Sequence, residues 1–141
     1  MALQWWVGAN GGFYQDIFVS YTPGDLYTFS AWYQDDAASV TTSTYLAKIE
    51  WFDISNIMLT SDVLGLSPLL NNTWQELSVS SVAPVSAHYA RVVVQGLGMV
   101  SGETLKIDNA SFYLVPEPSS IALLGLGLGA LLIFRRRTTA P

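Results

Sequence analysis

The feature that most constrains the fold is a strict two-residue alternation of apolar and polar side chains over residues 26–34. One face of this segment would carry Tyr27, Phe29, Ala31 and Tyr33. The other would carry Leu26, Thr28, Ser30, Trp32 and Gln34. A period of two is that of a β-strand with one buried face. Residues 45–53 repeat the pattern, and no window before Pro116 keeps a helical period over three turns. The sequence therefore predicts an all-β fold.

Five further segments rich in aromatic and β-branched residues complete a set of seven expected strands. They are residues 3–8, 13–21, 74–82, 89–95 and 105–114. Turn residues separate them, as in Pro23-Gly24-Asp25, where proline fixes φ and glycine accepts a positive φ. Many short strands with frequent turns favour an antiparallel β-sandwich of the jelly-roll kind, which we assign to residues 1–114.

Residues 115–141 differ in kind and form a separate tail. Residues 121–134 carry no polar side chain, and Arg135, Arg136 and Arg137 follow directly. As a helix this run reaches about 21 Å, against a bilayer core of about 30 Å, so a buried core helix is the alternative. The run is apolar on every side and the arginines can reach the headgroups. We expect one transmembrane helix over about residues 119–134, with its C-terminus in the cytoplasm.

Charge and chemistry exclude several functions. Before Pro116 the chain has three basic residues against ten acidic ones, which argues against a nucleic-acid partner. There is no cysteine, and His88 is the one histidine. Neither a nucleophile elbow nor a Gly-rich phosphate loop occurs, so we expect no enzymatic activity and no cofactor.

The tail combines three parts in a fixed order: Pro116-Glu117-Pro118, the apolar run, and the cluster Arg135, Arg136 and Arg137. This arrangement resembles the PEP-CTERM sorting signal. The resemblance implies that the chain is a substrate of exosortase, a membrane cysteine protease-transpeptidase of Gram-negative bacteria that make exopolysaccharide. It further implies passage through the inner membrane, cleavage near Pro-Glu-Pro, and delivery to the cell surface or extracellular matrix.

Four stretches of the body resemble a galactose-binding-like carbohydrate-binding module. They are Gln15 followed by Pro23-Gly24-Asp25-Leu26-Tyr27-Thr28-Phe29-Ser30-Ala31-Trp32, then Trp74-Gln75-Glu76-Leu77, Ala87-His88-Tyr89-Ala90-Arg91-Val92 and Lys106-Ile107-Asp108-Asn109-Ala110-Ser111-Phe112. The resemblance implies a jelly roll that binds polysaccharide. It would be N-terminally incomplete, because the one or two opening strands and a Gly-Phe-Glu-like motif are not found.

Candidate ligand residues follow from the aromatic content. Tryptophan rings can stack on the apolar face of a pyranose, and the candidates are Trp5, Trp6, Trp32 and Trp51, with Trp74 as a further one. The alternative for each is a place in the core. Asp108 matches the position that often supplies a structural calcium ligand in this fold, against the alternative of a solvated or turn-capping aspartate, since calcium needs six or more oxygens.

Two functions remain open. The first is an exported surface or matrix protein that binds polysaccharide, and the second is an accessory carbohydrate-binding fragment of a larger secreted glycoside hydrolase. Residues 1–12 contain no basic start and no long apolar stretch, which a signal peptide requires. We therefore expect an upstream extension carrying a signal peptide and one or two strands, the alternative being a gene fragment.

Overall fold

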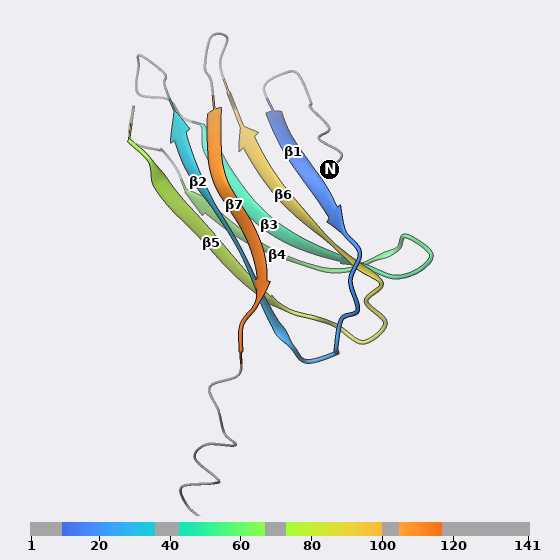
Figure 1. The fold of residues 1–141 in the computed structure, drawn as a ribbon. Helices are drawn as coiled ribbons and strands as arrows, with labels where there is room; N and C mark the ends of the chain where they lie inside the picture. Colours follow the sequence, from blue (N-terminus) through green and yellow to red (C-terminus); the bar gives the residue numbers. More distant parts are fainter. Residues whose placement is uncertain (1–9, 36–42, 67–72, 100–104, 117–141) are drawn as a thin grey trace, which may run out of the picture.

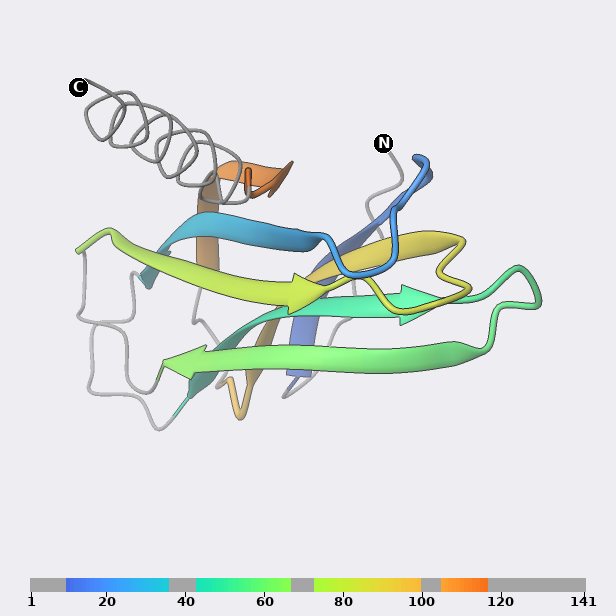
Figure 2. The same cartoon turned by 90° about the horizontal axis from the view of Figure 1, so that it is seen from below.

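Seven antiparallel strands make up the part of the chain that the structure, a computed structural model, describes: residues 10–35, 43–66, 73–99 and 105–116. In chain order the strands are β1 (Asn10–Ile17), β2 (Leu26–Asp35), β3 (Thr44–Phe52), β4 (Met58–Leu66), β5 (Gln75–Val82), β6 (Tyr89–Leu97) and β7 (Leu105–Leu114). They form a four-stranded sheet of order β1-β6-β3-β4 and a three-stranded sheet of order β5-β2-β7. Figures 1 and 2 show the two sheets as stacked layers. The predicted all-β antiparallel sandwich is confirmed.

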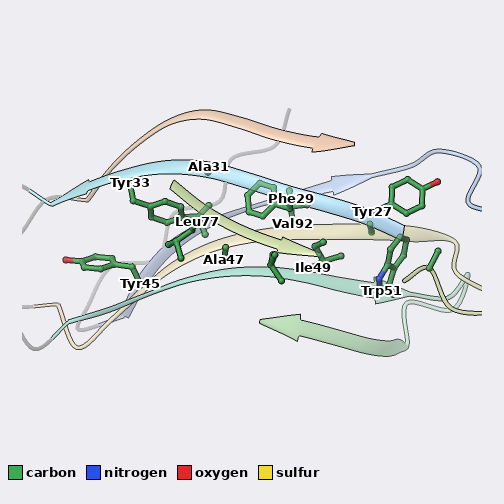
Figure 3. Packing of buried hydrophobic residues seen from close by; sticks show 14 residues of the cluster. Tyr27, Phe29, Ala31, Tyr33, Tyr45, Ala47, Ile49, Trp51, Leu77 and Val92 are labelled. Atoms are coloured by element: carbon green, nitrogen blue, oxygen red, sulfur yellow. The ribbon is translucent and has the colours of Figure 1, made fainter. Parts of the chain in front are cut away.

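The core lies between the layers and is built by the alternation seen in the sequence. Tyr27, Phe29, Ala31 and Tyr33 of β2 face Ala47, Ile49 and Trp51 of β3 across the interior (Figure 3). At one end of the core, the rings of Tyr27 and Phe112 stack 5.4 Å apart, and Trp51 meets Tyr27 edge-on at 5.6 Å. Such ring pairs add stability beyond the apolar area they bury.

Strand β4 was not predicted from the sequence, and its surroundings explain why. It pairs with β3 alone at the edge of its sheet, and its residues from Met58 to Gly65 are all exposed. A strand with no buried face has no need of apolar–polar alternation, so it leaves no periodic signal. The expected strand 3–8 lies outside the described residues. β1 ends at Ile17, four residues before the expected end, because the apolar Phe18 and Val19 belong to an exposed loop.

Three loops and the end of β7 lie at one end of the sandwich (Figure 1). Residues 18–25 join β1 to β2, residues 53–57 join β3 to β4, and residues 83–88 join β5 to β6. Backbone hydrogen bonds tie them together: Ala83 N donates to Asp25 O at 2.9 Å, and His88 N donates to Phe52 O at 2.8 Å. At the same end, Val115 N donates to Leu26 O, which fixes where the chain leaves the sandwich.

The expected membrane helix, about residues 119–134, lies outside the described residues. Within the described ranges, no helix is long and apolar enough to cross a membrane.

Candidate functional site

The outer face of the three-stranded sheet presents the exposed ring of Trp32. Trp32 lies on the central strand β2, in register with Glu76 of β5 on one side and Asp108 of β7 on the other. Its side chain points away from the core because its neighbours Ala31 and Tyr33 point inward. Trp32 is 37% exposed. One flat ring between two exposed carboxylates is therefore available to a ligand.

A second tryptophan extends this surface. Trp74 immediately precedes β5, and continuing the alternation of that strand places it on the same face as Glu76. Continuing the register brings it opposite Gln34, diagonal to Trp32, and diagonal neighbours in a sheet are about 7–8 Å apart. Trp74 is 39% exposed. This continued register places both exposed rings on one face of the sheet, and we call the pair an aromatic platform.

Two hydroxyl pairs lie on this face, each joining a buried residue of β2, Thr28 or Ser30, to an exposed serine of a neighbouring strand. Thr28 Oγ1 and Ser80 Oγ lie 2.8 Å apart across β2 and β5, and Ser30 Oγ and Ser111 Oγ lie 3.0 Å apart across β2 and β7. These pairs satisfy one another, so the central hydroxyls are held in place. Tyr113 is exposed at the far end of the face. We call the surface made by Trp32, Trp74, Glu76, Asp108 and these hydroxyls the platform face.

A β-bulge in β7 positions Asp108 on the platform face. Ser30 pairs with Ser111 and Trp32 with Asp108, so two residues of β7, Asn109 and Ala110, oppose Ala31 alone. Asn109 has a φ of 50°, in the left-handed region that asparagine tolerates. Its N–H donates to Asp108 Oδ1 at 2.7 Å. Bulges re-aim side chains in this way, and without this extra residue Asp108 would fall on the opposite face.

Of the remaining predicted site residues, the structure describes Trp51 and Pro116. Trp51 is 0% exposed, and its Nε1 donates to Ser81 Oγ at 2.7 Å within the core. No ring face is available there, so the prediction of Trp51 as a ligand residue is wrong. Trp5 and Trp6 lie outside the described residues, as do Glu117, Pro118, Arg135, Arg136 and Arg137. Pro116 is described and lies exposed just beyond β7.

The geometry around Asp108 bears on the predicted calcium ligand. Asp108 is exposed and uses one carboxylate oxygen to accept from the next backbone N–H. Among the residues that the structure describes, no group of three or more acidic, histidine or cysteine side chains is placed to hold a metal ion. The turn-capping contact is the one that the structure gives Asp108, and calcium binding stays a prediction.

Sequence reasoning missed a second polar cluster, on the outer face of the four-stranded sheet. Arg91 of β6 makes a paired contact with Asp16 of β1, with Nε–Oδ1 2.6 Å and Nη2–Oδ2 3.0 Å. Its guanidinium lies 4.2 Å from the ring centroid of Tyr14 and 4.9 Å from that of Phe52. The hydrogen bonding of the Arg91 guanidinium to the Asp16 carboxylate, which accepts, raises the pKa of Arg91. Through these contacts Arg91 of β6 links to side chains of β1 and β3. The cluster forms because strand pairing brings residues distant in sequence together, so no local pattern predicts it.

A cavity of about 450 Å³ opens between the sheets beside β1 and β7. Its walls are mainly apolar, from Phe13, Phe29, Val92, Val94 and Ile107, and the bulge residues Asp108 and Asn109 reach its rim. Tyr14, Gln15, Asp108 and Asn109 add polar groups to this lining, so the cavity is a second candidate site for a ligand. The platform face differs from it in presenting two exposed tryptophan rings.

The comparisons with known proteins address the tail first. The family model of the PEP-CTERM protein-sorting motif matches residues 114–137. The tail is a PEP-CTERM sorting motif. A tail of this kind marks a protein for membrane-associated transit and export to the cell surface, processed by exosortase. No curated protein sequence matches the chain.

Solved structures address the body that precedes the PEP-CTERM tail. The enzymatically active domain of tailspike protein 4 of bacteriophage CBA120 superimposes with a TM-score of 0.58 and 23% identity, over 75% of this chain and 14% of that one. A carbohydrate-binding module of the β-sandwich superfamily superimposes with a TM-score of 0.55 and 12% identity, over 74% of this chain and 42% of that one. The chain thus spans less than half of either, and the body has the β-sandwich fold of carbohydrate-binding modules.

Proposed function

We propose that the chain is the surface-sorted part of an exported protein and binds polysaccharide weakly through the platform face. The observation that carries this proposal is the exposure of Trp32 and Trp74 on one face of one sheet. A flat indole ring packs against the C–H face of a pyranose and excludes water there. Two rings side by side suit consecutive sugars of a chain, which a single exposed aromatic would not.

The polar groups around the rings match the other half of a sugar. Glu76 and Asp108 flank Trp32 and can each accept hydrogen bonds from sugar hydroxyls. The exposed hydroxyls of Ser80 and Ser111 on the same face can donate as well as accept. The platform face is an open sheet surface and buries little of a ligand, so we expect weak binding with broad specificity.

The tail supplies the sorting part of the proposal. We expect exosortase to recognise Pro116-Glu117-Pro118 while residues 121–134 cross the inner membrane once as a helix. Arg135, Arg136 and Arg137 then lie in the cytoplasm and the β-sandwich lies outside, as the positive-inside tendency requires. In this proposal the chain is the substrate of the sorting reaction, and the catalytic cysteine belongs to exosortase. The β-sandwich itself performs no catalysis.

A second function keeps the same platform face in a different setting. In this alternative the chain is the carbohydrate-binding part of a larger secreted glycoside hydrolase. Its support is the fold match to 14% of an enzymatically active tailspike domain. In both settings the platform face holds the polysaccharide. They differ in whether a catalytic domain accompanies it.

Affinity electrophoresis of the detergent-solubilised full chain tests the platform face. Gels containing the host exopolysaccharide, and a panel of other glycans, should retard the protein. The variant Trp32→Ala/Trp74→Ala should weaken binding at least about tenfold, which corresponds to about 1.4 kcal/mol. Phe18→Ala, which removes a more exposed ring at the end of the sandwich, is the control and should migrate like the parent. Unretarded migration of the parent in every glycan would overturn the proposal.

A further inference from the structure

The end of the sandwich at which β7 finishes carries a group of exposed apolar side chains on three neighbouring loops. The most exposed are Ile54 of the β3–β4 loop, at 78%, and Val85 of the β5–β6 loop, at 76%. The others are Phe18, Val19, Ile57 and Met58. Single exposed apolar residues are common on protein surfaces, but several on loops that are hydrogen-bonded to one another mark a surface that meets another apolar phase. We call these six residues the loop-tip patch.

Hydrogen bonds close the β3–β4 loop, which carries Ile54 and Ile57. Asp53 Oδ1 accepts from the backbone N–H of Ser55 and of Ile57, each at 2.8 Å. Asn56, between them, has a φ of 61°. The Asp53 side chain therefore closes this turn, and Ile54 and Ile57 are exposed on it.

The course of the chain indicates what lies beyond this end. The hydrogen bond from Val115 N to Leu26 O holds the exit of β7 at the same end as the loops. The apolar run begins at Ile121, five residues after Pro116. Five extended residues span at most about 18 Å. A bilayer that receives the tail must therefore lie close to this end of the sandwich.

The charges of the loops indicate which interaction with a membrane could hold them there. Residues 18–25, 53–57 and 83–88 contain Asp25 and Asp53 and no lysine or arginine. Attraction to anionic lipid headgroups requires basic residues, so it cannot supply the affinity. Apolar insertion of the side chains remains as the driving force, and it is independent of headgroup charge.

We propose that the loop-tip patch docks on the lipid bilayer, with Ile54 and Val85 inserted at the boundary between headgroups and acyl chains. The sandwich then stands on the membrane by its loops, next to its own anchor. This inference draws on the anchor role of the tail proposed above, and the experiment reports on the two separately. Until exosortase cuts the tail, docking fixes the platform face relative to the membrane.

Single-cysteine labelling tests the docking, since the chain has no cysteine of its own. The variants Ile54→Cys and Val85→Cys receive a polarity-sensitive fluorophore in the full chain. Val63→Cys is the matched control, an exposed valine on β4 away from the loops, and Gly127→Cys reports on the tail. Each labelled chain is reconstituted into phosphatidylcholine vesicles, with and without phosphatidylglycerol and with nitroxide-labelled lipids.

Docking predicts that the labels at 54 and 85 shift to the blue and lose most of their emission to shallow nitroxides, while the label at 63 does neither. Phosphatidylglycerol should change these results little. Unquenched labels at 54 and 85 would overturn the docking even if the label at 127 is quenched, which would leave the anchor intact. A blue shift without lipid quenching would show that protein covers the patch, and would also overturn it. Quenching of the labels at 54 and 85 but not of the label at 127 would support docking and would contradict membrane insertion of the tail.

Discussion

At the residue scale, strand parity decides what each tryptophan does. Trp51 is in phase with Ala47 and Ile49, whose side chains face the core, so its ring is buried. Trp32 is out of phase with Ala31 and Tyr33 and so lies on the outer face. The sequence already contained this distinction, because the alternation assigned the two rings to an apolar and a polar face. The prediction of Trp51 as a ligand residue rested on its being a tryptophan and disregarded this alternation.

Ser81 should matter for stability because it satisfies the buried indole N–H of Trp51. Its Oγ accepts from Trp51 Nε1 and donates to Asp62 Oδ2 at 2.6 Å. Ser81→Ala leaves the N–H unpaired and should lower the free energy of unfolding by about 1–3 kcal/mol. Denaturant unfolding of the full chain measures this, with the exposed Ser78→Ala as the matched control. Equal stabilities of the two variants would contradict the role of Ser81.

Buried tyrosines should make the fold sensitive to alkali. Burial raises the pKa of Tyr21 to about 12, and burial also raises the pKa of Tyr33. An unfolded tyrosine ionises near pH 10, so the stability from keeping Tyr21 neutral is complete below pH 10. It is lost as the pH rises from 10 to about 12. Unfolding measured across this range should show a falling stability, with a smaller slope in Tyr21→Phe. An unchanged slope in that variant would contradict the assignment.

At the element scale, strands with one buried face could be predicted and the exposed edge strand could not. β2 and β3 lie within a residue or two of their expected bounds because burial of one face imposes alternation on their sequences. β4 has no buried face and so carries no such constraint. The bulge at Asn109 and Ala110, which places Asp108 on the platform face, depends on pairing with β2 and has no local signal.

The β1–β2 loop should depend on the glycine in its turn. Gly24 has a φ of 97°, and its N–H donates to Ala83 O at 2.9 Å, which ties the loop to the end of β5. Gly24→Ala puts a side chain on a left-handed backbone and should cost about 1–2 kcal/mol of unfolding free energy. The neighbouring exposed Thr22→Ala is the control and should cost much less. Equal thermal midpoints would show that the turn tolerates other conformations.

At the scale of the whole molecule, the sequence predicted the class of fold and the sorting tail, while the site required the structure. The order β5-β2-β7 brings Trp32, Trp74 and Asp108 onto one face, although Trp74 and Asp108 follow Trp32 by 42 and 76 positions in the sequence. Such register between distant strands depends on the packed core and cannot be read from local patterns. The tail is the opposite case, since its three parts are contiguous and matched the sorting motif directly.

Export of the protein and delivery of its β-sandwich to the cell surface depend on the PEP-CTERM tail. The most direct test is the intact mass of the protein recovered from the surface of the native host, compared with that of the Glu117→Ala variant. We predict that the surface form of the parent ends near Pro116-Glu117-Pro118 and lacks Arg135, Arg136 and Arg137, and that the variant stays in the inner membrane with its tail intact. Recovery of both proteins at the surface with an uncut C-terminus would contradict the account.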